Sequence, residues 1–169
     1  MFGKPRKLDT EAELYELAVR ALMRRAHSVH EMKQKLERRS DNKLLVQMVM
    51  ARLKENGQID DARYAKQFAR QRTESRKQGK YRITRDLRAR GVPDRHIDSA
   101  LEAASAETDE AAMVRQGIER KLKFLRGEID DRKIASLYRS LLRAGFSADV
   151  IRRELRSMTK EEVPDVAAE

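Results

Sequence analysis

The sequence has no cysteine and no tryptophan, and its 169 positions include only three prolines, four tyrosines and four phenylalanines. Without cysteine, disulfide bonds and thiolate metal sites are excluded, and a reducing cytosolic setting is the natural expectation. No apolar run approaches the roughly 20 residues that span a bilayer, and the N-terminus lacks the apolar region of a signal peptide. We therefore expect a soluble cytoplasmic protein without a membrane segment.

Apolar residues are few relative to charged ones. Hydrophobic residues make up 40% of the chain and charged residues 39%, so a single large core would be hard to fill. Several thin cores of about 45 to 50 residues each, as in repeat proteins, fit this composition better. No segment has the pattern of a β-strand, and the expected fold class is all-α.

A short helical pattern occurs twice, 54 residues apart. Each copy has two apolar residues four positions apart, then a glycine, an apolar residue and a second apolar pair with the same spacing. Residues four apart share one helix face, and a glycine permits the left-handed conformation that ends a helix. The two copies are Ile83, Leu87, Gly91, Val92, Ile97, Leu101 and Leu137, Leu141, Gly145, Phe146, Ile151, Leu155. A fainter third copy, Met32 and Leu36, precedes the first by 51 residues, which indicates a tandem array of helical units.

Local signals divide the chain into three such units. Ser28 followed by Glu31 predicts a capping box, and Pro93 suits the first turn of a helix. We expect three tandem three-helix modules forming an elongated, curved array, followed by a disordered acidic tail. Their bounds are 8–57, 58–104, 105–158 and, for the tail, 159–169. On a helical wheel the apolar face that opens the second module comprises Ala62, Ala65, Phe68 and Ala69.

Enzymatic signatures are missing. His27, His30 and Glu31 have metal-ligand spacing, but capping and surface roles are the better interpretation of residues at a helix start. Asp60 and Asp61 form an acid pair that is better explained by helix capping than by metal or general-acid chemistry. We expect no catalytic residue, no metal site and no cofactor, and therefore no enzyme.

Positive charge is concentrated in the middle of the chain. The net charge is +10, and residues 59–91 contain eleven Lys and Arg against four Asp and Glu, whereas residues 98–111 have five acids and no base. This segregation predicts a surface that binds a polyanion. An ordinary solvated face, with Asp86 pairing Arg82 or Arg90, is the alternative. The candidate nucleic-acid-binding residues are Arg63, Lys66, Arg70, Arg72, Arg76, Lys77, Lys80, Arg82, Arg85 and Arg88.

Two helices joined at a glycine also resemble helix-turn-helix DNA readers. Such proteins need Arg, Gln or Asn aimed at base edges, whereas the start of the relevant helix here reads Asp94-Arg95-His96. A stand-alone helix-turn-helix-like DNA-binding protein remains an alternative function, as does an unrelated helical scaffold.

Four short motifs, in order along the chain, resemble the RecX family of bacterial recombination regulators. Three of them lie in the second module and one in the first, and the resemblance covers about residues 11–157. The motifs are His27-Ser-Val-His-Glu31-Met-Lys-Gln-Lys-Leu36, Gly57-Gln-Ile-Asp-Asp-Ala-Arg-Tyr-Ala65, Arg70-Gln-Arg72, and Gly79-Lys-Tyr-Arg-Ile83 leading to Leu87-Arg-Ala-Arg-Gly91.

The resemblance implies a fold of three tandem three-helix modules. It also implies a regulator of homologous recombination, DNA repair and the SOS response that binds the RecA–single-stranded DNA filament along its helical groove. There it would inhibit the recombinase, ATPase and LexA coprotease activities of RecA, by blocking filament extension or promoting disassembly. Direct binding to single- and double-stranded DNA is implied as well. We expect the protein to act as a monomer.

Overall fold

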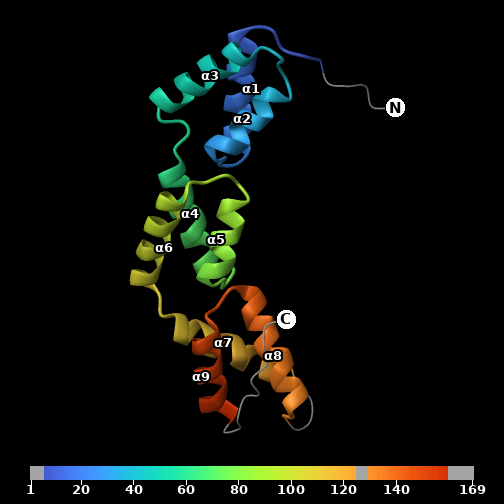
Figure 1. Ribbon diagram of the computed structural model, residues 1–169, viewed down its shortest axis with the longest axis vertical. Coiled ribbons are helices and arrows are strands. Elements are labelled where there is room, and N and C mark those ends of the chain that lie inside the picture. Colours follow the sequence, from blue (N-terminus) through green and yellow to red (C-terminus); the bar gives the residue numbers. More distant parts are fainter. Residues whose placement is uncertain (1–5, 125–128, 160–169) are drawn as a thin grey trace, which may run out of the picture. The chain divides into compact units, whose positions relative to one another are not determined.

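The computed structural model describes residues 6–124 and 129–159, and every regular element in these two ranges is an α-helix (Figure 1). The all-α prediction is confirmed. The predicted disordered tail lies outside the described residues, apart from the last residue of α9. The helices are α1 (Glu11–Arg24), α2 (Val29–Glu37), α3 (Lys43–Glu55), α4 (Asp61–Glu74), α5 (Lys80–Arg88), α6 (Asp94–Glu107), α7 (Glu110–Leu122), α8 (Asp131–Ala144) and α9 (Ala148–Thr159).

Short polar side chains begin several of these helices. The Thr10 hydroxyl accepts from the Glu13 amide at the start of α1, and Asn42 caps α3 in the same way. The predicted capping box at α2 is confirmed, because the Ser28 hydroxyl accepts from the Glu31 amide while the Glu31 carboxylate accepts from the Ser28 amide. Such caps satisfy amides that have no partner within the helix.

Three glycines end helices in the left-handed conformation. Gly57, Gly91 and Gly145 have φ of 63°, 69° and 93°. In each case the next residue's amide donates to the carbonyl five positions back, which is the bond of a Schellman motif. The sequence prediction that Gly91 and Gly145 turn the chain between two helices is therefore confirmed.

Close contacts group the chain into two compact units. The first comprises Met1–Gln67 with Leu87–Ser99, and the second Phe68–Asp86 with Ala100–Glu169. The division passes through α4, α5 and α6, so each unit contains parts of these three helices.

The core of the first unit lies among α1, α2 and α3, which pack against one another. Their apolar faces bury Leu14, Met32, Leu36, Val49 and Leu53 completely, and two of these, Met32 and Leu36, are the fainter third copy of the repeat. Among the described residues of both units, no helix combines the length and apolar character needed to cross a bilayer.

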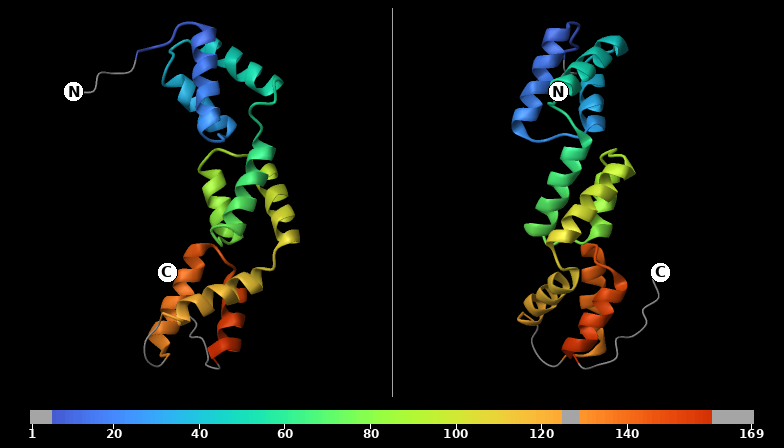
Figure 2. Two further views of the ribbon diagram at one scale, coloured as in Figure 1. Left: turned by 180° about the vertical axis from the view of Figure 1, so that it is seen from behind. Right: turned by 90° about the vertical axis from the view of Figure 1, so that its left-hand side faces the viewer.

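The core of the second unit lies among α7, α8 and α9, which stay side by side from each direction in Figure 2. The second copy of the repeat supplies Leu137, Leu141, Phe146, Ile151 and Leu155 to this core, all of them buried. They are joined by residues of α7 and by Ile134 and Tyr138. The prediction that this copy buries one face of each of two helices is confirmed.

One sequence prediction on α4 is wrong in detail. Ala62 is exposed, and Tyr64, 8% exposed, lies on the buried side of α4 instead. Helical periodicity alone does not tell which side of a helix with mixed residues faces the core. Gly79 is buried immediately before α5, beyond the end of α4 at Glu74.

In the first unit, the start of α2 contacts the chain turn that ends α5. The Ser28 hydroxyl donates to the Arg90 carbonyl at 2.6 Å. A β-carbon on Gly91 would lie 2.5 Å from the His30 side chain, so the turn backbone touches His30 directly. The Val29 amide, which has no partner within α2, donates to Asp61 Oδ1 at 2.9 Å.

In the second unit, the start of α5 contacts the turn that ends α8 in the same manner. The Gly79 amide donates to the Ala144 carbonyl at 2.8 Å, and the Tyr81 amide to the Gly145 carbonyl at 3.1 Å. Ser28 and Gly79 are equivalent at the repeat offset of 51, and Arg90 and Ala144 at the offset of 54. The repeated sequence therefore builds one joint twice, each time with the amide end of one helix against the carbonyl end of another, an arrangement that helix dipoles favour.

Candidate nucleic-acid interface

The predicted basic residues lie on α4, on α5 and in the segment between them. Arg63, Lys66 and Arg88 belong to the first compact unit, and the other seven belong to the second. All ten are exposed except Arg72 and Arg82, which are half-buried.

Two exposed cations without an acidic partner among the described residues lie in the segment between α4 and α5. Arg76 and Lys77 are exposed in this connection, and neither forms an ion pair with a residue of the described ranges. Lys77 has φ of 49°, the one non-glycine residue with left-handed φ in the described chain. This uncommon conformation turns the connection around and leaves both side chains in solvent. They are therefore available to an anionic ligand.

Three of the predicted cations are committed to contacts within their unit. Arg70 pairs with Glu74 at 2.9 Å, and Arg88 with Asp94 at 2.8 Å. Each hydrogen bond raises the pKa of its arginine. Arg82 Nη1 donates to the Arg143 carbonyl at 3.3 Å, so its guanidinium belongs to the joint at the start of α5. Ion pairs as exposed as Arg70–Glu74 and Arg88–Asp94 are weak and can exchange partners. The Arg82 bond, in contrast, is part of the contact between α5 and the end of α8.

Aromatic rings lie beside two of the cations in the second unit. The Arg72 guanidinium lies 4.7 Å from the centre of the Phe68 ring, and Lys80 Nζ lies 5.2 Å from that of Tyr81. The Tyr81 side chain is 59% exposed. An exposed ring among cations can stack on an unpaired base, as in proteins that bind single strands. Tyr81 is not among the contacts predicted from the sequence, although its place between Lys80 and Arg82 is a usable signal.

In the first unit, Lys66 is exposed and without an ion pair among the described residues, while Arg63 Nη2 donates to the Gly57 carbonyl at 2.6 Å. In the second unit Arg85 is likewise exposed and unpaired among the described residues. Among the described residues, the cations of the predicted set with no ion pair, hydrogen bond or ring contact are thus Lys66, Arg76, Lys77 and Arg85, and Lys80 lies beside Tyr81.

The acidic residues considered for chemistry have structural roles. Asp60 caps α4 by accepting from the Arg63 amide at 3.0 Å, a bond that lowers the pKa of its carboxyl group. Asp61 instead caps α2, as described above. The prediction of capping at the start of α4 is thus confirmed for Asp60, whereas the carboxylate of Asp61 accepts from an amide of α2, a helix distant in sequence.

The histidine–glutamate set at the start of α2 is also accounted for by local contacts. Glu31 belongs to the capping box and pairs with Arg25 at 3.1 Å. His27 is 7% exposed, and its Nδ1 lies 2.9 Å from the Arg25 carbonyl, so the interpretation of His27 as a surface residue is wrong. Within the described ranges, no three side chains of His, Asp or Glu are grouped as metal ligands.

Comparisons with known proteins agree with this architecture. Residues 60–101 match the family model described as RecX, second three-helix domain. A solved structure of RecX from Lactobacillus salivarius is similar with a TM-score of 0.71, over 89% of this chain and 97% of that one, at 20% identity. A second, a regulatory protein RecX, gives a TM-score of 0.73 over 90% and 72%, at 22% identity. At these identities the two structures establish the fold alone.

Proteins that are similar in sequence show to which family the chain belongs. The chain is 42% identical to the regulatory protein RecX of Halorhodospira halophila, over 81% of this chain and 83% of that one. It is 34% identical to that of Pseudomonas entomophila over 88% and 93%. It is 33% identical to that of Deinococcus radiodurans over 98% and 80%. These identities extend over most of both sequences in each pair, and the chain belongs to the RecX family.

Proposed function

We propose that this protein is a non-enzymatic regulator of RecA. It binds the RecA–single-stranded DNA filament, inhibits recombinase, ATPase and LexA coprotease activities, and so restrains recombination and the SOS response. The observation that carries the proposal is the 42% identity to a protein named regulatory protein RecX over most of both chains. The protein acts in the cytoplasm, as a monomer and without a cofactor.

We also propose that it binds single- and double-stranded DNA directly, through the basic residues of α4 and α5. Lys66, Arg76, Lys77 and Arg85 support this role because they are exposed and have no ion pair among the described residues. Cations of this kind contact phosphates and release counterions, which makes binding sequence-independent and sensitive to salt.

Three tandem modules, at residues 8–57, 58–104 and 105–158, suit this task. Modules joined along one chain add weak contacts through effective concentration, so a filament of repeated subunits is bound more tightly than one subunit. The match of residues 60–101 to a second three-helix domain supports the bounds of the central module.

RecA ATPase activity on single-stranded DNA tests the regulatory proposal. Substoichiometric protein should lower the steady-state ATPase rate, because one bound molecule that blocks extension or promotes disassembly affects many subunits. An unchanged rate at equimolar protein would refute the proposal.

Charge reversal tests the DNA contact separately. Replacing Lys66, Arg76 and Lys77 by glutamate should weaken DNA binding and reduce the slope of log affinity against log salt by about 2 to 3, because about three phosphate contacts are lost. The control replaces Lys33, Lys43 and Lys54 by glutamate, which changes the net charge equally at exposed positions of α2 and α3. Equal weakening by both triple variants would mean that net charge, rather than this surface, determines affinity.

A further inference from the structure

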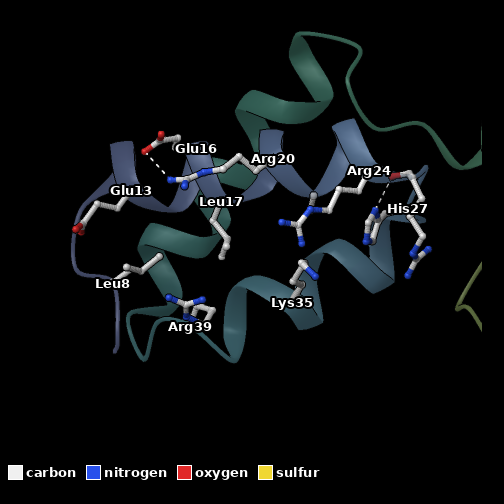
Figure 3. A pocket seen from close by; sticks show the side chains of 11 residues that line it. Leu8, Glu13, Glu16, Leu17, Arg20, Arg24, His27, Lys35 and Arg39 are labelled. Atoms are coloured by element: carbon white, nitrogen blue, oxygen red, sulfur yellow. Dashed lines mark hydrogen bonds and ion pairs between the residues drawn. The ribbon is translucent and has the colours of Figure 1, made fainter. Parts of the chain in front are cut away.

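A groove between α1 and α2, in the first compact unit, has no role in the function proposed above. Its cavity volume is about 650 Å³, and it is lined by side chains of both helices and by the segments that flank them. Figure 3 shows Arg24 of α1 and Lys35 of α2 pointing into the same space, with Leu17 between the two helices. None of the predicted DNA- or RecA-binding residues lines it.

The groove holds cations that lack acidic partners. Two of the lining cations do have acidic partners, since Arg20 pairs with Glu16 at 3.0 Å and Arg25 with Glu31 at 3.1 Å. In contrast, Arg24, Lys35 and Arg39 form no ion pair with any residue in the described ranges. Like charges that face one another across a groove repel, and a bound anion relieves that repulsion.

The chemistry of the two walls and the floor favours a protein ligand over a nucleic acid. Leu8, Leu17 and Ala21 make the floor apolar, and the lining contains no Phe, Tyr or Trp. Its one aromatic ring, the His27 imidazole, is 7% exposed and offers little surface on which a base could stack. Glu13 and Glu16 occupy one end of the α1 wall and pair with Arg6 at 3.4 Å and with Arg20 at 3.0 Å, so a continuous phosphate backbone would meet no unpaired cation of α1 there. A peptide can place carboxylates beside Arg24 and Lys35 only and cover the floor with an apolar side chain.

We propose that this groove binds an acidic segment of a partner protein, with at least two carboxylates and an apolar anchor. The carboxylates pair with Arg24 and Lys35, and the anchor packs on Leu8 and Leu17. Amphipathic segments bind grooves in this way elsewhere. The site requires neither the DNA surface of α4 and α5 nor the effect on RecA, so its test is independent of the proposed function.

Fluorescence anisotropy on the full chain tests the site, with a dye-labelled peptide of four Glu-Glu-Leu repeats as the probe. We expect the double variant Arg24→Glu, Lys35→Glu to weaken peptide binding at least tenfold. The control variant Lys43→Glu, Lys54→Glu, which carries the same charge change at exposed positions of α3 outside the groove, should bind the peptide as the wild type does. In NMR spectra of the wild type, the peptide should shift the methyl signals of Leu8 and Leu17 and the ring signals of His27, a readout that does not depend on any variant.

Three results would overturn the proposal. Binding of a matched Gln-Gln-Leu peptide with equal affinity would show that carboxylates are not recognised. Equal losses in the two double variants, or peptide-induced shifts that leave out Leu8, Leu17 and His27, would place binding elsewhere. If Arg24→Glu, Lys35→Glu lowered affinity for a twelve-nucleotide oligothymidylate as strongly as for the peptide, the groove would be a phosphate site instead.

Discussion

At the scale of single residues, the left-handed glycines separate two causes of strain. Gly57 and Gly91 have nearly equal φ, 63° and 69°. A β-carbon on Gly57 would meet no atom within 4 Å, whereas one on Gly91 would lie 2.5 Å from the Cβ and Cγ atoms of His30. A side chain at either position would thus have the same unfavourable backbone conformation, but only one at Gly91 would also collide with α2.

Alanine substitutions at these two glycines should therefore differ. Gly57→Ala should lower the free energy of unfolding by about 1–2 kcal/mol, the cost of a left-handed residue with a β-carbon. Gly91→Ala should lower it by more, because His30 and the start of α2 must also move. Urea denaturation of both variants measures the difference, and equal losses would show that the contact with His30 adds nothing to stability.

His27 gives the first unit a dependence on pH. Burial lowers the pKa of its imidazole below the ordinary value of about 6.5, and the nearby Arg25 charge acts in the same direction against the hydrogen bond to the Arg25 carbonyl. The unfolded state then binds more protons than the folded state below about pH 7. Stability should fall as the pH decreases through 6.5 toward the pKa of the folded protein.

Replacing His27 by glutamine should remove this dependence. We expect the free energy of unfolding of the wild type to decrease between pH 7 and pH 5, and that of His27→Gln to change less over the same interval. Urea denaturation at several pH values measures both slopes. A wild type whose stability is constant over this interval, or a variant with the same slope, would contradict the assignment to His27.

The residue-level predictions from sequence succeed where the partner is near in the chain. Ser28 and Glu31 are three residues apart, and Gly91 follows its helix directly, so the capping box and the left-handed turn could both be predicted. The roles of Asp61 and His27 could not. Asp61 caps a helix 32 residues earlier in the chain, and His27 is buried by packing that periodicity does not record.

At the scale of helices, the second unit depends on a close approach of two backbones. A β-carbon on Gly79 would lie 2.2 Å from the Gly145 carbonyl oxygen and 2.5 Å from the Phe146 amide nitrogen. Main-chain atoms cannot turn aside as a side chain does. Glycine is therefore required at position 79 because the backbone at Gly145 and Phe146 passes so close to it. The apolar spacing that identified the repeat gives no sign of this requirement.

Gly79→Ala should separate the start of α5 from the end of α8. The Tyr81 amide donates to the Gly145 carbonyl, so its hydrogen exchange should become faster in the variant. Gly117→Ala is the control, because Gly117 lies within α7 and its β-carbon would meet only the Leu141 side chain, at 3.1 Å. In the control the contact is with the end of a flexible side chain and alanine in a helix interior is favoured by up to about 1 kcal/mol, so exchange at Tyr81 should stay near the wild-type rate. Unchanged exchange at Tyr81 in Gly79→Ala would mean that the joint adapts.

Helix positions were largely predictable, whereas one helix face was not. Apolar spacing and caps located the helices of the repeat, because these signals are local. On α4 the wheel assigned Ala62 inward, yet Tyr64 is buried, since which side of a mixed helix faces the core depends on its neighbours. The ten candidate cations were predictable as a set, but only the structure shows that Arg82 is bonded to the end of α8.

At the scale of the whole molecule, the two apolar clusters should behave as separate sources of stability. One cluster contains residues of α1, α2 and α3 with Ile59, and the other residues of α7, α8 and α9 with Phe146. Each is buried within its own compact unit. Where stability is built from adjoining modules, a lost contact should loosen its own module first.

Paired truncations test this expectation. Leu53→Ala and Ile118→Ala each remove a fully buried side chain, one from each cluster, and each should cost about 2–5 kcal/mol in the unit that contains it. With Leu53→Ala, amide exchange should become faster in α1–α3 while the amides of α7–α9 keep their wild-type rates. Ile118→Ala should produce the reverse pattern. Because the two variants are compared with each other, a general effect of lower stability cannot imitate the result. If either substitution accelerated exchange equally from α1 to α9, the chain would unfold as one cooperative domain, and the modular basis of the proposed filament binding would be wrong.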